Sequence, residues 1–506
     1  MNARDEKTTS LWMDVEVAPD APRLTKDERA DVAVIGSGIA GLSTAYELSR
    51  RGLNVVVVDR GAIAGGMTAR TTAHLTANSD DYFDTLIKTR GLDGANTFYA
   101  SHSKAIDRME AIQAEERIEC NFRRLNGYLF LGPKTDKQEL EAEFNATKKV
   151  GMEVRWHKGV PFNHLSDVDC LLYPNQGAFH PLRYLRGVAG AITGRGGRLY
   201  ANTVVSEIAE KDSTVELKIE TGQKISAGRA VVATNSPINE RLKIHDKQAP
   251  YRTYVVVLTI PKGAIEDALY WDTLDPYHYV RLQPGPGGVD YLIVGGADHK
   301  TGEADDGEIR FEALEAWARG LLPNLGKVTH RWSGQVLDPV DYAAFIGLDP
   351  GHKNVFVHTG DSGQGITHGV VGSLLLADLI TTGKSDWAGF YDPARQTASA
   401  VQNFISENVT AVKNFAEYVA PGELSSFEEL EPGRGAIIRE GLNKVAAYRD
   451  EKGKVHRLSA KCTHAGCHVH WNSAEQCWDC PCHGSHFATD GSVLNGPAIS
   501  PLEKLA

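Results

Sequence analysis

The pattern of apolar and polar residues first predicts an alternation of buried strands and helices. Residues 31–36 and 54–59 are short, almost wholly apolar runs, as in strands that are buried on both faces of a parallel sheet. A helical stretch to about residue 51 joins them, and a third strand of this kind is predicted at 229–234. An apolar helix follows at 370–380. This alternation predicts an α/β sheet with helices packed on it.

A second group of extended runs lies in the middle of the chain. They cover residues 252–260, 279–282 and 291–294. The glycine- and proline-rich segment 285–288 predicts a hairpin turn between the last two. Residues 100–180 are expected to add helices. We therefore expect a mixed sheet inserted into the α/β part.

The pattern changes twice in the last part of the chain. Apolar residues at helical spacing from 401 to 416 predict an amphipathic helix. Short runs at 436–439 and 444–448, followed by a turn at 450–453, then predict antiparallel strands. The chain is therefore expected to end in a helical linker and a small β domain.

Composition restricts the classes of partner. The chain has 506 residues, more than an ordinary single domain, and its 42% hydrophobic and 24% charged residues are typical of a globular protein. The net charge of −11 leaves no basic surplus to neutralise phosphates, which argues against nucleic acid as a partner. The sequence shows neither an apolar run of about 18 residues nor the apolar stretch of a signal peptide. We therefore expect no membrane span and a cytoplasmic location.

The first predicted strand leads into a glycine motif of the kind that binds dinucleotides. Gly36, Gly38 and Gly41 form Gly-x-Gly-x-x-Gly between this strand and its helix. These glycines permit a tight turn, the approach of a pyrophosphate and the packing of helix on strand, and the helix N-terminus faces the diphosphate. Asp59, at the end of the second strand, is placed to accept hydrogen bonds from ribose hydroxyls.

Three further segments favour FAD over NAD. A glycine-rich loop at 65–68 follows the second strand, the strand at 229–234 ends in a small-residue turn, and a glycine loop at 360–369 meets the apolar helix. In this order the motifs resemble those of the glycine/D-amino-acid oxidase superfamily of FAD enzymes. The resemblance implies these cofactor-binding residues: Gly36, Ser37, Gly38, Ile39, Ala40, Gly41, Asp59, Arg60, Gly66, Met67, Thr68, Val205, Ala233, Thr234, Gly360, Gly363, Gly365, Ile366 and Thr367. No second motif of this type follows a strand, so we expect an organic substrate, not NADH, to reduce the flavin.

Two cysteines and two histidines near the C-terminus have a distinctive spacing. Cys462 and His464 form Cys-x-His, and Cys480 and His483 form Cys-x-x-His. A zinc module, the alternative, usually shows Cys-x2-Cys or His-x3-His spacing. The four residues resemble the ligand set of a Rieske [2Fe–2S] cluster, in which two histidines replace two thiolates on one iron and raise the reduction potential.

The resemblance to Rieske proteins of the cytochrome bc type extends beyond the ligands. It implies a disulfide between Cys467 and Cys482, although such a bond is unusual in the cytoplasm. Ser485 matches a serine that hydrogen-bonds a bridging sulfur, and residues 496–498 resemble the proline loop that covers the cluster. Phe487 stands where that pattern has tyrosine. The missing hydroxyl predicts a lower reduction potential than in respiratory Rieske proteins.

Candidate substrate-binding residues lie on the strands that roof the flavin ring in the superfamily. In amino-acid oxidases an arginine and tyrosines hold the substrate carboxylate, which suits the bidentate geometry of arginine. The candidates are Arg252, Tyr254, His278, Tyr279 and Arg281. Because side chains alternate between the faces of a strand, solvent or the other face of the sheet is the alternative place for each. His74 is expected to pack or hydrogen-bond, the alternative being covalent attachment of FAD.

The predicted fold class is α/β + β: a Rossmann-like FAD-binding domain with an inserted mixed-sheet substrate domain, followed by a small antiparallel β Rieske domain. The predicted boundaries are an N-terminal extension at 1–27, the FAD-dependent oxidoreductase at 28–395, a helical linker at 396–420 and the Rieske domain at 421–506. Within the oxidoreductase we expect FAD-binding parts at about 28–100, 180–240 and 330–395, and substrate-binding parts at about 101–179 and 241–329.

This combination predicts an oxidoreductase with two redox centres. An amine or amino-acid-like substrate would give a hydride to FAD, and the cluster, which accepts single electrons, would pass them to an external one-electron partner. A dehydrogenase is therefore favoured over an oxidase. Two alternatives are a reductase that receives electrons at the cluster from an external donor, and a non-catalytic redox sensor.

Overall fold

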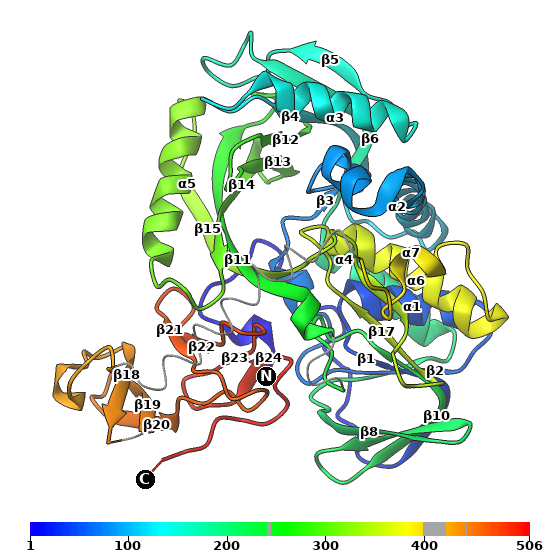
Figure 1. Ribbon diagram of the computed structural model, residues 1–506, viewed down its shortest axis with the longest axis vertical. Helices are drawn as coiled ribbons and strands as arrows, with labels where there is room; N and C mark the ends of the chain where they lie inside the picture. Colours follow the sequence, from blue (N-terminus) through cyan, green and yellow to red (C-terminus); the bar gives the residue numbers. More distant parts are fainter. Residues whose placement is uncertain (240–243, 398–420, 442, 506) are drawn as a thin grey trace.

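The computed structural model describes residues 1–239, 244–397, 421–441 and 443–505. The helix predicted at 401–416 lies outside these ranges. The described chain forms two large sheets with their helices, and two small sheets near the C-terminus (Figure 1).

The first large sheet has eight strands and contains the predicted parallel core. Its main path runs β16-β17-β10-β1-β2-β7, with β9 and β8 added beside β10. β1 is parallel to both neighbours, with Ile35 opposite Val232 of β10 and Val58 of β2. The strands are β1 (Glu28–Ile35), β2 (Val55–Val58), β7 (Arg198–Tyr200), β8 (Val205–Lys211), β9 (Thr214–Ile219), β10 (Lys224–Val232), β16 (Phe345–Leu348) and β17 (Val355–Thr359).

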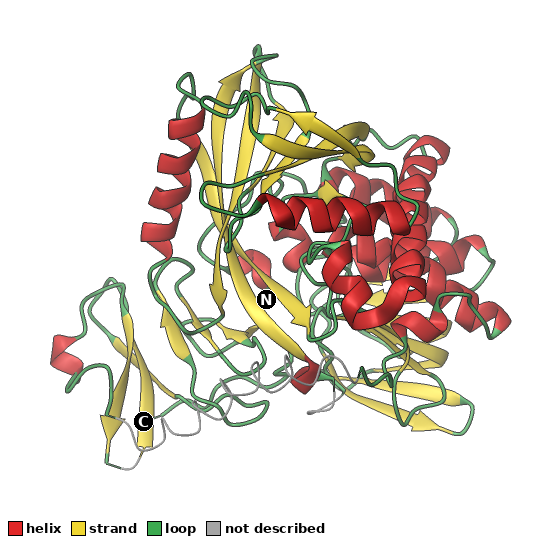
Figure 2. Cartoon of the chain, turned by 45° about the horizontal axis from the view of Figure 1, so that its top comes forward, coloured by secondary structure: helices red, strands yellow, loops and turns green. Residues whose placement is uncertain are grey.

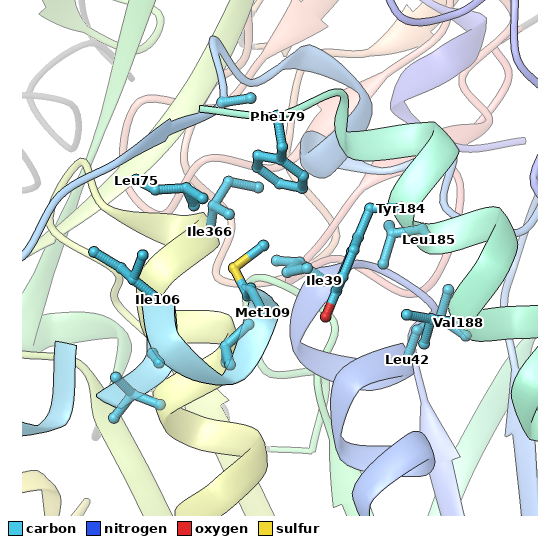
Figure 3. Packing of buried hydrophobic residues seen from close by; sticks show 14 of the residues in the cluster. Ile39, Leu42, Leu75, Ile106, Met109, Phe179, Tyr184, Leu185, Val188 and Ile366 are labelled. Carbon is cyan, nitrogen blue, oxygen red and sulfur yellow. The ribbon is translucent and has the colours of Figure 1, made fainter. Parts of the chain in front are cut away.

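Helices pack on this sheet through a continuous apolar core. Figure 3 shows Ile39 of α1 (Ile39–Arg50), Met109 of α2 (Phe83–Glu115), Tyr184 of α4 (Pro181–Gly194) and Ile366 of α6 (Gly365–Thr382) side by side. All four side chains are buried in one cluster. Within the described ranges, α6 alone is long and apolar enough to cross a membrane, and 61% of it is buried inside the protein. Its apolar composition therefore has a role in the core.

The second large sheet has nine strands in the order β15-β11-β14-β13-β12-β4-β6-β3, with β5 paired to β6. The predicted hairpin is confirmed, because β13 and β14 are antiparallel neighbours. The strands are β3 (His74–Leu75), β4 (Arg123–Phe130), β5 (Arg155–Lys158), β6 (Asp169–Ala178), β11 (Gln248–Pro261), β12 (Leu269–Asp272), β13 (Tyr279–Pro284), β14 (Val289–Lys300) and β15 (Val328–Pro339). α3 (Lys137–Lys149) and α5 (Gly307–Leu321) accompany this sheet, and α7 (Ala388–Tyr391) lies beyond α6.

The expectation of helices at residues 100–180 was incomplete. That range holds the end of α2 and all of α3, but it also supplies β4, β5 and β6 to the mixed sheet. β4 has four partly buried residues followed by four buried ones, so its pattern does not alternate. Pairing with β6 and β12 makes this segment a strand, and the local sequence does not carry that information.

The C-terminal domain consists of two small antiparallel sheets, of three and four strands. Figure 2 shows it as strands, loops and the short helical turn η5 (Phe427–Glu429) beside the much larger remainder of the chain. Its strands are β18 (Gly435–Glu440), β19 (Asn443–Arg449), β20 (Val455–Ser459), β21 (His470–Asn472), β22 (Cys477–Asp479), β23 (His486–Phe487) and β24 (Val493–Asn495). The predicted α/β + β fold class is confirmed.

The first residues of the chain connect the large domain to the C-terminal one. The backbone of Arg4, in the short helical turn η1 (Ala3–Asp5), donates to Gly65 O at 2.8 Å. The backbone of Lys7 donates to Glu475 O of the C-terminal domain at 3.1 Å. Trp12 is fully buried, and its Nε1 donates to Thr71 O at 2.6 Å. The N-terminal segment is therefore part of the packed structure, next to β24 in Figure 1.

Candidate active site

A cavity of about 860 Å³ is lined by residues of both large sheets and of the C-terminal domain. It contains most of the residues predicted to bind the dinucleotide. Those in its wall are Gly36, Ser37, Gly38, Ile39, Ala40, Asp59, Arg60, Gly66, Met67, Thr68, Val205, Ala233, Thr234, Gly363, Gly365 and Ile366. Gly41, Gly360 and Thr367 lie outside the wall.

The glycine motif leaves no room for larger side chains. Gly36 has φ +97°, and a Cβ there would lie 2.3 Å from Ala233 O. A Cβ on Gly41 would lie 1.9 Å from Gly36 O, so this glycine lets α1 approach β1. Gly38 begins α1 without a side-chain cap. Ile39 N, the first backbone N–H of α1, donates to Thr68 Oγ1 at 3.0 Å, and both residues line the cavity. The N-terminus of α1 therefore lies at the cavity, where a diphosphate would bind.

Asp59 is held at the end of β2 by hydrogen bonds. Ser37 donates to its Oδ2 through N at 2.9 Å and through Oγ at 2.6 Å. Gly61 N donates to Oδ1 at 3.0 Å. The carboxylate is thus oriented beside the glycine motif, where a ribose would bind.

Several buried polar atoms of the wall have no hydrogen-bond partner among the described residues. They are Asn235 Nδ2, Asn78 Oδ1, Gln364 Oε1 and His74 Nε2. Gln364 Nε2 donates to Asn78 O and Thr76 Oγ1, both at 2.6 Å, which assigns its free oxygen. Donors and acceptors of both kinds suit the heteroatom-rich edge of a flavin. The residues present therefore fit FAD.

The five predicted substrate-binding residues lie in different environments. Tyr279 alone among them lines the cavity, and its Oη is 2.5 Å from Thr253 Oγ1. Tyr254 is almost fully buried, with Oη 3.0 Å from His299 Nε2. His278 is 2.8 Å from Asp272 Oδ2 through Nδ1 and stacks on Trp317 at 4.1 Å.

The two arginines are buried outside the cavity wall. Arg281 donates through Nη1 to Ala73 O at 2.7 Å and to Phe179 O at 3.1 Å. Arg252 donates through Nη2 to Asp479 Oδ1 of the C-terminal domain at 2.7 Å. Both guanidinium groups therefore hydrogen-bond other groups of this protein.

The cavity also contains acidic and aromatic residues that were not predicted. Tyr277 Oη donates to Asp80, at 3.0 and 3.1 Å from its two carboxylate oxygens. Ser362 Oγ donates to Asp81 Oδ2 at 2.7 Å. Burial, together with the charge of Asp81, raises the pKa of Asp80 to about 8. Burial likewise raises the pKa values of Asp81 and Asp298 to about 6. The adjacent aspartates after the glycine-rich loop were the available sequence signal.

The predicted cluster ligands come together in the C-terminal domain. Cys462 and Cys480 are buried, and a hydrogen bond between their thiols lowers the pKa of Cys462. The rings of His464 and His483 are 4.9 Å apart, and His483 Nδ1 is buried with no hydrogen-bond partner in the described chain. Two thiols beside two imidazoles fit the donor set of a Rieske [2Fe–2S] cluster.

The surroundings of these ligands match the resemblance as well. Cys467 and Cys482 form a disulfide. Ser485 hydrogen-bonds Cys462 through its side chain, and its Oγ accepts from Ala498 N at 3.0 Å. Phe487 is fully buried in the same apolar cluster as both cysteine ligands.

The ligand histidines face the large domain. His245, in the turn η3 (His245–Lys247), has its ring 4.9 Å from that of His464 and 5.7 Å from that of His483. Ser236 Oγ is 3.3 Å from His245 Nδ1, and Ser236 directly follows Asn235 of the cavity wall.

The C-terminal domain also completes the cavity itself. Leu494, Asn495, Gly496 and Ile499 belong to its wall. Gln335, another wall residue, donates through Nε2 to Gly484 O at 3.0 Å. The two predicted cofactor sites are therefore joined by a continuous contact.

Comparison with known proteins agrees with this geometry. Residues 31–379 match the family described as DAO, FAD dependent oxidoreductase, and residues 423–506 match the Rieske [2Fe-2S] domain. The Rieske 2Fe-2S iron-sulfur protein YhfW of Bacillus subtilis (strain 168) is 31% identical over 503 residues, which is 99% of this chain and 98% of that protein. The gamma-glutamylputrescine oxidoreductase of Escherichia coli (strain K12) is 26% identical over 71% of this chain and 85% of its own.

Among solved structures, glycine oxidase from Geobacillus kaustophilus has the same fold in the large domain. It is 18% identical with a TM-score of 0.61, covering 73% of this chain and all of its own. The matched domains imply FAD and a [2Fe–2S] cluster as cofactors. The chain belongs to the DAO family of FAD-dependent oxidoreductases, in a form that carries a C-terminal Rieske [2Fe-2S] domain.

Proposed function

We propose that the protein is a dehydrogenase that oxidises an amine-type substrate at FAD and passes the electrons singly, through its Rieske cluster, to an external acceptor. FAD supplies hydride acceptance, and the cluster supplies one-electron transfer. Tyr279, Tyr277 and Asp80 would line the substrate part of the cavity. The name of the Escherichia coli relative, gamma-glutamylputrescine oxidoreductase, points to the same substrate class.

The contact between the two domains is the observation that carries the proposal. The ligand histidines His464 and His483 lie against His245. His245 Nδ1 is 3.3 Å from Ser236 Oγ, and Ser236 follows Asn235 of the cavity wall. Gly496, in the predicted cluster-covering loop, belongs to the wall itself. An electron that leaves the flavin would therefore be able to pass to the cluster of the same molecule.

An external partner would approach the cluster from its other side. Lys461 and Thr463, which flank the ligand Cys462, are exposed. One-electron exchange with a soluble carrier requires close approach and no deep pocket. The external partner is therefore expected to dock on this loop.

The experiment is an anaerobic screen of the holoprotein with amines and amino acids. A substrate should bleach the flavin absorbance first and then produce the EPR signal of the reduced Rieske cluster. Flavin bleaching with no cluster signal would reject the electron path. Rapid reduction of the flavin by NADH or a ferredoxin, with none by amines, would show that electrons flow in the opposite direction.

A further inference from the structure

One part of the cavity wall, which we call the acidic wall, combines carboxylates with aromatic rings. It consists of Asp80, Asp81, Tyr277, Tyr279 and Asp298. Asp80 and Asp81 precede α2, whereas the other three come from the region of β13 and β14. The hydrogen bond from Tyr277 to Asp80, at 3.0 Å, shows that the two segments meet in the cavity. The rings of Tyr277 and Tyr279 are 5.4 Å apart.

The three carboxylates are not paired with a cation. Asp80 accepts from a phenol and Asp81 from the Ser362 hydroxyl, and no Lys or Arg forms an ion pair with either in the described ranges. Asp298 Oδ1 is buried without a hydrogen-bond partner among the described residues. The neighbouring Arg310 is engaged by both carboxylate oxygens of Asp306, at 2.6 and 3.0 Å. Thr253, Arg310 and His278 lower the pKa of Asp298 in part, but among the described residues no lysine or arginine forms an ion pair with any of the three carboxylates.

The pKa values are consistent with missing compensation. Burial raises the pKa of Asp80 to about 8, and the charge of Asp81 raises it further. Burial also raises the pKa of Asp298 to about 6. A bound cation would reverse these shifts, because an opposite charge nearby favours the ionised carboxylate.

Among the described residues of the cavity wall, the arginines are engaged by other groups of the protein and no lysine is present. Arg60 and Arg70 are the lysine or arginine residues among those that line the cavity. Arg70 donates to Ala3 O, Thr8 O and Ser333 O at 2.8 to 2.9 Å and lies 3.1 Å from Glu475. Arg60 neighbours Asp59 at the dinucleotide end of the cavity. The acidic wall therefore favours a positive ligand.

The aromatic rings of the acidic wall add independent support. Tyr277 and Tyr279 lie beside Asp80 and Asp298, and Asp298 Oδ1 is buried with no hydrogen-bond partner among the described residues. Tyrosine faces attract ammonium groups, as in the aromatic cages that bind alkylated amines. Carboxylates beside aromatic rings are the complement of an alkylammonium ion.

We propose that the acidic wall binds the ammonium group of an alkyl amine whose α-carbon carries no carboxylate. This inference rests on the proposed function and narrows its substrate class from amines and amino acids to simple amines or diamines. It also explains how the site can operate without an arginine clamp: Arg252 and Arg281 are both bound to protein groups.

The test compares pentylamine with norleucine, which differ by one α-carboxylate. Each is titrated anaerobically into the holoprotein, and the flavin spectrum reports binding and reduction. Pentylamine should act at a concentration at least tenfold below that needed for either norleucine enantiomer. Asp80→Asn should raise the concentration of pentylamine required by about tenfold or more, the loss expected from one charge-assisted hydrogen bond.

Asp84→Asn is the matched control. It removes the same charge four residues away, outside the cavity, where Asp84 pairs with exposed Lys88 at 2.6 Å. The FAD content of each variant shows whether it has folded. Asp298→Asn serves as the second test if Asp80→Asn loses FAD.

The possible failures can be told apart. A response to norleucine that equals or exceeds that to pentylamine would overturn the inference and leave the proposed function intact. No response to any amine or amino acid would overturn both. If Mg²⁺ alone perturbs the flavin spectrum and Asp80→Asn abolishes that effect, the wall binds metal and the inference is wrong.

Discussion

At the scale of single residues, the ion pair between Arg252 and Asp479 is fully buried between the domains. Arg252→Gln would leave the buried carboxylate of Asp479 without its arginine partner, whereas Glu6 would keep Arg70 and His486. Removing one partner of such a pair costs about 3–5 kcal/mol. We therefore expect the free energy of unfolding, measured in guanidinium chloride, to fall by about this amount. Arg155→Gln, which breaks an exposed pair with Glu153, should change stability by about 0.5 kcal/mol or less. Equal effects would contradict this prediction.

Gly36 provides a second prediction at this scale. Gly36→Ala places a Cβ against Ala233 O at a positive φ, so β1 and β10 must separate beside the cofactor. We expect at least a tenfold loss of FAD affinity, measured by fluorescence titration of the apoprotein. Gly190→Ala, in α4, has no atom within 4 Å of the new Cβ and should leave the affinity unchanged. Wild-type affinity in Gly36→Ala would show that the turn can adapt.

Phe487 provides a third prediction at the scale of single residues. Phe487→Tyr would add a hydroxyl beside the cysteine ligands, since Phe487 packs in the same cluster as Cys462 and Cys480. One extra hydrogen bond of about 1 kcal/mol to the reduced cluster corresponds to about +40 mV for a one-electron couple. Redox titration followed by EPR measures this shift. Phe487→Leu tests whether packing alone moves the potential, and an equal rise there would refute the hydrogen-bond explanation.

At the scale of elements, local sequence predicted the parallel core and the hairpin but not every strand. β2 consists of four buried valines, and such an apolar run predicts a buried strand from the local sequence alone. β4 mixes polar and apolar residues and became a strand through its neighbours β6 and β12. The acidic wall was missed for a similar reason, since Asp80 and Asp298 are far apart in sequence and meet through the arrangement of α2 and β14. Ligand spacing, in contrast, is local, so the cluster motif could be predicted.

The N-terminal segment gives a prediction about acid stability. Glu6 is buried, and although burial alone would raise its pKa, the charges of Arg70, His486 and Arg252 outweigh it and lower the pKa. A carboxylate with a lowered pKa stabilises the folded state above its unfolded pKa, about 4.3, and this contribution disappears as the pH falls towards the folded pKa. Stability should therefore decline below about pH 4. In Glu6→Gln the decline should be shallower by up to about 1.4 kcal/mol per pH unit.

Thermal unfolding between pH 3 and pH 7 measures this effect. Asp31→Asn is the control, because Asp31 accepts from the backbone of Asn54 at an exposed position and forms no ion pair with an arginine in the described part of the chain. If Glu6→Gln and wild type lose stability with the same slope, Glu6 does not carry the acid sensitivity of the domain interface.

At the scale of the whole molecule, the docked Rieske domain predicts electron transfer within one chain and without domain movement. Gln335 bonds Gly484 at 3.0 Å, and His486 Nε2 lies 2.7 Å from Gln335 Oε1, so the contact beside the cavity is already formed. After flavin reduction by a substrate, cluster reduction should be first-order, with a rate constant unchanged by hundredfold dilution. It should also be unaffected by added glycerol, since a domain that had to swing into place would slow as viscosity rises.

Freeze-quench EPR measures the rate. His245→Ala should slow it, because the His245 ring contacts both ligand histidines and its Nδ1 is 3.3 Å from Ser236, next to Asn235 of the cavity wall. His330→Ala, which replaces a histidine of β15 paired with Val257 of β11, should not slow it. A rate proportional to protein concentration would show that electrons pass between molecules, and a rate that falls with viscosity would show that the docked arrangement is not the one that transfers them.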